Sequence, residues 1–160
     1  MPQRPVSKVI EQQEIIAVTP ATSIIEAVRL MKERHIGALM VVESDRLVGI
    51  LSERDVVRHL GRDWGALASR PVSDVMTKAV VTVSRFATVA DVMERMTEKR
   101  IRHMPIVDNG ELVGIVSIGD VVKRKIEETE SRIREQIAAG KTLGEARAVL
   151  GYHTLQRTGP

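Results

Sequence analysis

The sequence predicts an α/β protein made of two copies of one β-α-β-β-α unit, packed as a pseudo-twofold pair and followed by an extended C-terminal helix. Three observations lead to this prediction. Residues 18–58 align on residues 83–123 without a gap, and the match is closest between residues 47–57 and 112–122. Within each copy, helically spaced apolar residues alternate with short, β-branched apolar runs. Two repeats of this length favour a paired module over an open solenoid.

In the first copy, Ser23 and Glu26 have the spacing of a capping box, in which each side chain bonds the other residue's backbone at a helix start. Residues 38–42 are almost wholly apolar, as is typical of a strand buried on both faces. The expected elements are a strand at residues 14–18, a helix after Ser23, strands at residues 38–42 and 47–51, and a helix from Ser52 to about Leu60.

The second copy repeats this order. Asp108-Asn109-Gly110 predicts a hairpin turn, because Asn and Gly both tolerate positive φ. The expected elements are a strand at residues 80–83, a helix from Thr88 to about Lys99, strands at residues 104–107 and 112–116, and a last helix opened by Ser117 or Gly119. Residues 61–70 are expected to form a linker between the copies.

The last helix is expected to continue beyond the repeat and to end at Gly140. Its narrow apolar stripe can pack on its own domain or on a partner helix. The stripe consists of Val122, Ile126, Ile133 and Ile137. Thr142 is expected to cap a short segment through Leu150.

Composition restricts the possible functions. The chain has no cysteine, which excludes disulfides and thiolate chemistry, and its aromatic content of 2% weakens any role that depends on base stacking. No apolar run approaches the roughly 18 residues of a membrane span, and the N-terminus lacks the apolar core of a signal peptide, so we expect a cytoplasmic protein. The four histidines lack metal-ligand spacing, and no nucleophile elbow is found. We therefore expect no catalytic and no metal-binding residues.

Each copy ends its last strand with Ser-x-x-Asp, at Ser52–Asp55 and at Ser117–Asp120. At a helix start this spacing brings a hydroxyl, a carboxylate and backbone N–H groups together, where they can receive an anion or the vicinal diol of a ribose. The same spacing also forms a capping box that only stabilises the helix, so both interpretations remain open.

The pattern Leu-Val-Gly-Ile-(Leu/Val)-Ser-x-x-Asp occurs at residues 47–55 and 112–120, preceded by apolar runs at residues 36–42 and 101–107. It resembles the CBS domain, which is named for cystathionine beta-synthase and usually occurs in tandem as a Bateman module. The whole chain resembles small stand-alone bacterial CBS-pair proteins. The resemblance implies CBS domains at residues 5–62 and 71–126, with a helical extension at 127–160.

The resemblance also implies a non-catalytic regulatory protein, active in energy sensing, that forms a flat homodimer and contacts an unidentified downstream protein. Two clefts between the sheets are expected to bind adenosine nucleotides such as AMP, ADP, ATP or NAD(H). By the same resemblance, Asp55 and Asp120 would hold ribose with Ser52 and Ser117 beside them. The expected adenine contacts are Val18, Ile36 and Gly37 for the Asp120 cleft, and Thr82, Ile101 and Arg102 for the Asp55 cleft. Phosphate is expected to meet Arg102 or His103 at the Asp120 cleft and Arg54 at the other.

Two other functions remain as alternatives. One is a nucleic-acid-binding or scaffold role through the basic tail, although acidic residues dilute its charge. The other is a nucleotide hydrolase that uses the Ser-x-x-Asp carboxylates.

Overall fold

A computed structural model describes the chain at residues 5–10, 13–61 and 64–149. Its contacts divide the chain into two compact units, the first ending at Ile118 and the second beginning at Gly119. The first unit contains the whole first repeat and the second repeat up to the end of its last strand. Among the described residues, no helix has both the length and the apolar character that crossing a membrane requires.

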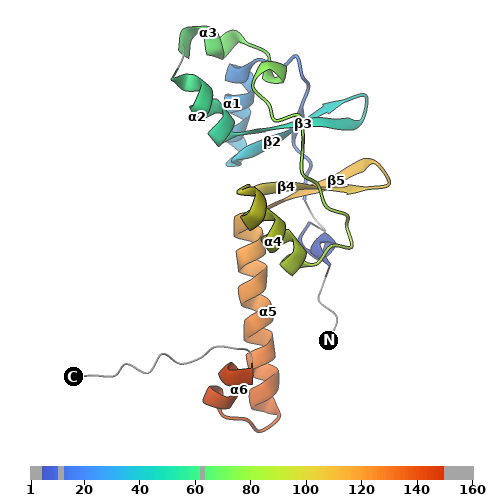
Figure 1. Cartoon of the computed structure of the whole chain (residues 1–160), viewed down its shortest axis with the longest axis vertical. Coiled ribbons are helices and arrows are strands. Elements are labelled where there is room, and N and C mark those ends of the chain that lie inside the picture. The colour runs from blue at the N-terminus through green and yellow to red at the C-terminus, as the bar shows by residue number, and fades with distance from the viewer. Residues whose placement is uncertain (1–4, 11–12, 62–63, 150–160) are drawn as a thin grey trace, which may run out of the picture. The chain divides into compact units, whose positions relative to one another are not determined.

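The first sheet has the strand order β1-β2-β3, of which β2 and β3 are labelled in Figure 1. The β1 strand (Ala17–Val18) runs parallel to β2 (Ala38–Glu43), and β2 pairs antiparallel with β3 (Arg46–Ser52). Four of the six residues of the central strand, β2, are buried, so the prediction of a strand buried on both faces is confirmed. The strand expected at residues 14–18 is shorter than predicted, since only its last two residues pair with β2.

The second sheet is the hairpin of β4 (His103–Asp108) and β5 (Glu111–Ser117). Its two turn residues, Asn109 and Gly110, have φ values of 50° and 84°, which confirms the predicted turn. The strand expected at residues 80–83 is not formed. Only Val83 joins this sheet, through a parallel bridge to Ile106.

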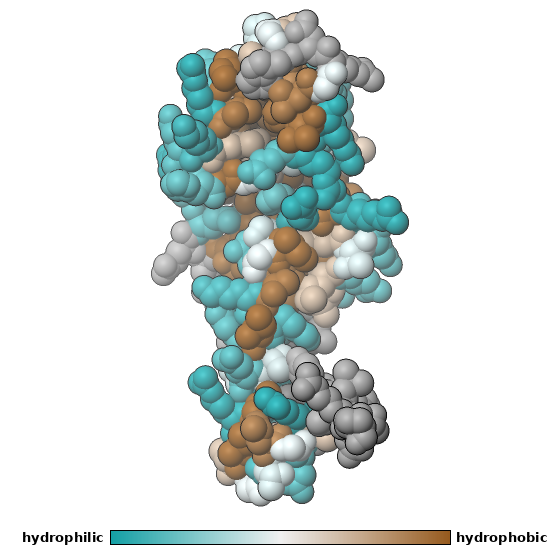
Figure 2. Space-filling model, turned by 90° about the vertical axis from the view of Figure 1, so that its left-hand side faces the viewer, coloured by the Kyte–Doolittle hydropathy of each residue, from teal (hydrophilic) through white to brown (hydrophobic). Residues whose placement is uncertain are grey.

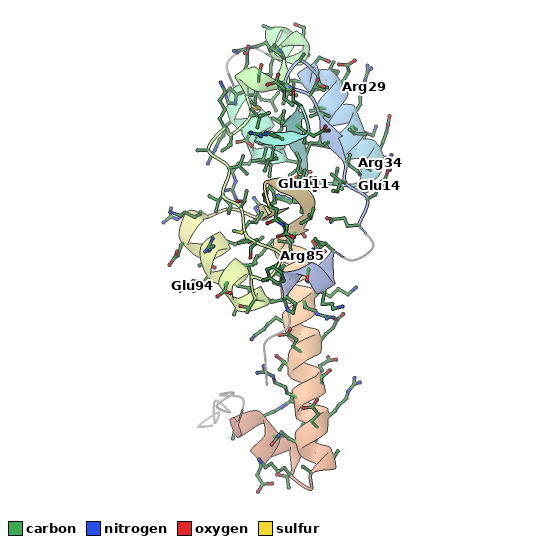
Figure 3. The ribbon with its side chains drawn as sticks, turned by 90° about the vertical axis from the view of Figure 1, so that its right-hand side faces the viewer. Glu14, Arg29, Arg34, Arg85, Glu94 and Glu111 are labelled. Atoms are coloured by element: carbon green, nitrogen blue, oxygen red, sulfur yellow. The ribbon has the colours of Figure 1, made fainter. Side chains whose placement is uncertain are left out.

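Three helices of the first unit begin at capping boxes: α1 (Ile24–Arg34), α2 (Glu53–Leu60) and α4 (Val89–Lys99). The prediction of helix starts after Ser23, Ser52 and Thr88 is therefore confirmed. Arg34, at the end of α1, forms a 2.8 Å ion pair with Glu14 (Figure 3). This pair ties the segment before β1 to the far end of α1.

The segment expected as a linker, residues 61–70, contains a short helix, α3 (Trp64–Ser69), that the sequence did not predict. Leu67 is only 2% exposed and packs in the same core cluster as Ile24 of α1 and Leu51 of β3. One turn and a half of helix is too short to be stable alone, so this burial supplies the stability that the local sequence lacks.

Each repeat begins with a segment that docks against the other repeat. The 3-10 helix η1 (Val6–Val9) follows Pro5, which bridges to Thr88 at the start of α4. The equivalent η2 (Val72–Asp74) follows Pro71, which bridges to Ser23 at the start of α1. Val6 and Val72 are both fully buried. The two repeats therefore exchange their first segments, which joins them into a single unit.

The exchanged segments continue along the neighbouring strands. Thr77 and Ile50 of β3 exchange two backbone hydrogen bonds of 2.9 and 3.0 Å. At the equivalent place in β5, the backbone N–H of Ile115 donates to the side-chain oxygen of Gln13 at 2.8 Å. The β3 and β5 strands also contact each other directly. Each exchanged segment thus hydrogen-bonds to the last strand of the other repeat.

The second unit holds most of α5 (Ile118–Ala138) and all of α6 (Leu143–Val149). Gly140 follows α5 with a φ of 86°, a conformation that favours glycine, and this confirms it as the end of the helix. Thr142 caps α6, since its backbone N–H and its hydroxyl both donate to Glu145, at 2.8 and 2.7 Å. The prediction that this segment reaches Leu150 concerns a residue outside the described part of the chain.

Because of the capping box of α4, we expect the fold to lose stability in acid. Hydrogen bonds from the Thr88 side chain and backbone hold the pKa of Asp91 below its ordinary value of 3.8. A carboxyl whose pKa is lower in the folded than in the unfolded state stabilises the fold above the unfolded value, and this stabilisation disappears as the pH falls through the folded value. We expect urea unfolding of the Asp91→Asn variant to depend less on pH below about 4 than unfolding of the unmodified chain. An unchanged pH dependence would contradict this role.

Candidate ligand-binding pocket

A pocket of about 430 Å³ lies beside the first half of α2. Three segments form its walls: the start of α2 with Ser52, residues 77–81, and the start of β4 with residues 101–103. The first segment belongs to the first repeat and the third to the second repeat. The volume falls within the roughly 300–1,000 Å³ of typical small-molecule sites. A ligand in this pocket would therefore contact both repeats at once.

Hydrogen bonds to backbone groups hold these walls together. The paired bonds between Thr77 and Ile50 fix residues 77–81 against β3. The N–H of Glu53, the first residue of α2, donates to the carbonyl of Gly37 at 3.0 Å. Arg54 Nη1 donates to the carbonyl of Arg100 at 2.8 Å, which links α2 to the turn before β4. These bonds thus hold the three walls of the pocket in place.

Ser52 and Asp55 form a capping box on the pocket wall. Asp55 Oδ2 accepts hydrogen bonds from the backbone N–H of Ser52 at 2.9 Å and from its hydroxyl at 2.6 Å. Asp55 N–H donates back to the Ser52 hydroxyl at 3.4 Å. The second carboxylate oxygen, Oδ1, takes no part in this box and can accept hydrogen bonds from a ligand.

The capping box alone does not identify a binding site. Thr88 and Asp91 form the same box at α4, with bonds of 2.9 and 2.7 Å, and Ser23 and Glu26 form it at α1. What distinguishes Asp55 is its place on a pocket whose walls carry several charged side chains. Asp55 therefore caps α2 and also lines a cavity, and its role as a ligand-binding residue stays a prediction.

Several basic side chains line the pocket. Arg54 and Arg58 are four residues apart, so they lie on the same side of α2, and Arg102 and His103 enter from the second repeat. Glu53 provides an opposing negative charge in the same wall. Arg58 was not among the predicted site residues. Its spacing from Arg54 was the signal that could have found it.

The predicted adenine and phosphate residues separate into three groups. Gly37, Arg54, Ile101, Arg102 and His103 all line the Asp55 pocket. Val18 and Ile36 pack against the core cluster of the first repeat. Thr82 lines a different cavity of about 660 Å³, where the turns of both hairpins also contribute.

Gly37 and His103 were expected on the Asp120 cleft but line the Asp55 pocket, and Arg102 lines the Asp55 pocket, where it was expected to contact adenine, rather than the Asp120 cleft, where it was expected to meet phosphate. A Cβ atom added to Gly37 would lie 3.3 Å from His103 Cε1 and 3.3 Å from Glu53 Oε2. Gly37 and His103 stand at the starts of equivalent strands, β2 and β4. These starts therefore meet beside α2, which brings all three residues to the Asp55 pocket.

The other Ser-x-x-Asp pair lies across the boundary between the two units. Ser117 is the last residue of β5, and Asp120 lies in the first turn of α5. A second ligand cleft at Asp120 stays a prediction. In the part of the chain that the structure describes, no group of three or more His, Cys, Asp or Glu residues is arranged to hold a metal ion.

Comparison with known proteins gives a consistent family. The family model described as "CBS domain" matches residues 6–62 and 72–127. The chain is 35% identical over 121 residues to the mitochondrial CBS domain-containing protein CBSX3 of Arabidopsis thaliana, and the match covers 72% of this chain and 59% of the plant protein.

Two solved structures are similar across most of their length. A CBS-domain containing protein from Agrobacterium tumefaciens has a TM-score of 0.72 and 38% identity, covering 76% of this chain and 92% of that one. A CBS-domain pair solved in complex with 5′-methylthioadenosine and S-adenosyl-L-methionine has a TM-score of 0.71 and 25% identity, covering 79% of this chain and 99% of that one.

Proposed function

Because this chain belongs to the CBS-domain family and carries two such domains in tandem, we propose that it is a non-catalytic regulatory module that binds an adenosine nucleotide in the Asp55 pocket. The observation that carries the proposal is the convergence of the Ser52–Asp55 box with Arg58, Arg102 and His103 on one cavity. A carboxylate suits a ribose diol, and arginine guanidinium groups suit phosphate.

Each part of the nucleotide has a matching part of the pocket. Asp55 Oδ1 would accept hydrogen bonds from the two ribose hydroxyls. Apolar wall residues, among them Val80 and Ile101, would cover the adenine. Arg58 and Arg102 would meet the phosphates from opposite repeats. The CBS-domain pair solved with two adenosine derivatives supports the adenosine portion of this assignment.

Regulation would follow from the position of the pocket between repeats. A bound nucleotide changes an equilibrium only to the extent that it binds two arrangements with different affinity, and such couplings are typically about 1–3 kcal/mol. Because the walls come from α2 and from the start of β4, the ligand would favour the arrangement in which these two elements close on it. We propose that the change is passed to a second copy of the chain or to a downstream protein in the cytoplasm.

Calorimetry on the purified chain tests this function. We expect AMP, ADP, ATP or NAD(H) to bind, and Arg102→Ala to weaken ATP binding by about tenfold to a hundredfold, because a charge-assisted hydrogen bond contributes roughly 1.5–3 kcal/mol. The same variant should change the affinity for 5′-methylthioadenosine, which has no phosphate, much less. Arg29→Ala, an exposed arginine on α1 (Figure 3), is the control and should bind ATP normally. If no adenosine compound binds the unmodified chain, the proposed function is wrong.

A further inference from the structure

A second cavity, the hairpin-turn cavity, has a volume of about 660 Å³. Its walls are residues 44–47 at the turn between β2 and β3, residues 107 and 109–111 at the turn between β4 and β5, and Lys78, Val80 and Thr82 from the segment that joins the repeats. Both turns point to the same side of the first unit in Figure 1. Figure 2 shows the opposite side, where hydrophobic side chains reach the surface in patches between hydrophilic ones. The hairpin-turn cavity is instead lined mostly by polar and charged residues.

Two tight turns shape this cavity. Ser44 and Asp45 have φ values of 48° and 61°, and residues 109–110 of the second hairpin also both have positive φ. Two consecutive residues with positive φ are characteristic of the two-residue turns that best fit twisted hairpins. Arg46 and Glu111 follow these turns as the first residues of β3 and β5. The two hairpins therefore hold side chains of opposite charge at equivalent positions in the cavity wall.

The charged side chains of the cavity are balanced in sign. Arg46 and Lys78 are positive, whereas Asp45 and Glu111 are negative. All four are exposed to solvent, and none of them belongs to an ion pair within the part of the chain that the structure describes. A simple anion would match only the first two, and a simple cation only the other two. A ligand that carries both charges is complementary to all four.

We propose that the hairpin-turn cavity binds a free α-amino acid in its zwitterionic form. The guanidinium group of Arg46 and the ammonium group of Lys78 would donate hydrogen bonds to the carboxylate of the ligand. The carboxylates of Asp45 and Glu111 would accept hydrogen bonds from its ammonium group, which has three donors. The same two carboxylates would repel a nucleotide phosphate, so the hairpin-turn cavity and the Asp55 pocket would bind different ligands.

The segment that joins the repeats forms a wall of both pockets. Lys78 and Thr82 line the hairpin-turn cavity, Thr77 and Val81 line the Asp55 pocket, and Val80 lines both. A ligand that displaces this segment in one pocket therefore changes the shape of the other. We expect a bound amino acid to change the affinity for nucleotide severalfold, and nucleotide to change the affinity for the amino acid by the same factor. This coupling rests on the proposed function, whereas the amino-acid site itself does not.

Calorimetry on the full chain, with each common L-amino acid in turn, tests the site. We expect saturable binding of at least one amino acid, with a Kd of about 1 mM or lower. Conversion of its carboxylate to the amide, or acetylation of its ammonium group, should each lower the affinity at least about tenfold, because each removes charge-assisted hydrogen bonds. If no amino acid binds, or if either derivative binds as tightly as the parent, the proposal is wrong.

The variants Arg46→Gln and Glu111→Gln locate the site. Each should weaken amino-acid binding at least about tenfold. The matched controls, Arg29→Gln on α1 and Glu94→Gln on α4, carry the same substitutions at other exposed residues and should bind normally (Figure 3). Because all four residues are exposed, circular dichroism should show the same fold in every variant. Normal binding by both cavity variants, or equal losses in the controls, would place the amino acid elsewhere and overturn the proposal.

Two further measurements separate this inference from the proposed function. Asp55→Ala should still bind the amino acid, and a loss of binding would show that the ligand occupies the nucleotide pocket, which overturns the proposal. An amino-acid concentration that fills the site of the unmodified chain but not that of Arg46→Gln should change the affinity for ATP severalfold only in the unmodified chain. An affinity for ATP that does not respond would refute the coupling. Amino-acid binding by a chain that binds no adenosine compound would support the site and refute the proposed function.

Discussion

Replacing Asp55 with alanine is expected to abolish nucleotide binding at its pocket, while the same replacement at Asp91 should leave binding intact. Two hydrogen bonds from ribose hydroxyls to a carboxylate contribute roughly 1.5–3 kcal/mol each. Losing them should lower the affinity by at least about a hundredfold, because each 1.4 kcal/mol corresponds to a factor of ten. Calorimetry with the tightest-binding nucleotide would then show one fewer binding event for Asp55→Ala.

Asp91 is a closely matched control. Both aspartates are the third residue of their helix, and both accept a bond of 2.9 Å from the N-cap backbone, with hydroxyl bonds of 2.6 Å at Asp55 and 2.7 Å at Asp91. Both alanine variants lose a capping box, so both should unfold at lower urea concentration. Only Asp55 also lies on the pocket. If the two variants lose nucleotide affinity equally, Asp55 acts through helix stability rather than through contact with the ribose.

Most helices and strands of the first unit could be predicted because their signals are local. A capping residue followed by helical spacing defines α1, α2 and α4, and Asn109-Gly110 defines the second hairpin. Helix α3 could not be predicted this way. Leu67 anchors it in the core, so its signal depends on a tertiary contact rather than on periodicity.

Several residues of the site could be predicted from the sequence, but which of them share one pocket could not. Alignment of the repeats shows that Gly37 and Arg102 are equivalent, and equivalence alone suggests that they serve different clefts. The structure places both on one pocket, because the starts of β2 and β4 meet beside α2. Local sequence patterns also do not reveal that the repeats exchange their first segments. It depends on pairings such as that of Pro5 with Thr88, which are far apart in the chain.

Because of this exchange, we expect a side chain at Gly49 of β3 or at Gly114 of β5 to destabilise the fold. A Cβ atom at Gly49 would overlap the sulfur of Met76, and one at Gly114 would lie 2.7 Å from Ile10 Cδ1 and 3.0 Å from Gln13 Oε1. Both contacts are with the exchanged segment that pairs with that strand. We expect Gly49→Val and Gly114→Val each to lower the free energy of unfolding by about 1–3 kcal/mol, as overpacked sites usually do. Gly61 has no atom within 4 Å of its added Cβ, so Gly61→Val should change stability by less than about 0.5 kcal/mol.

The two strand variants should differ in nucleotide binding, although their effects on stability are similar. Displacing Met76 moves the neighbouring Thr77, which lines the Asp55 pocket and exchanges two bonds with Ile50. Gly49→Val should therefore weaken nucleotide binding at this pocket severalfold. Gly114→Val acts on Ile10 and Gln13, outside the walls of the pocket, and should bind normally at Asp55. Equal affinity in the two variants, measured by calorimetry at a temperature where both remain folded, would show that the exchanged segment does not shape the pocket.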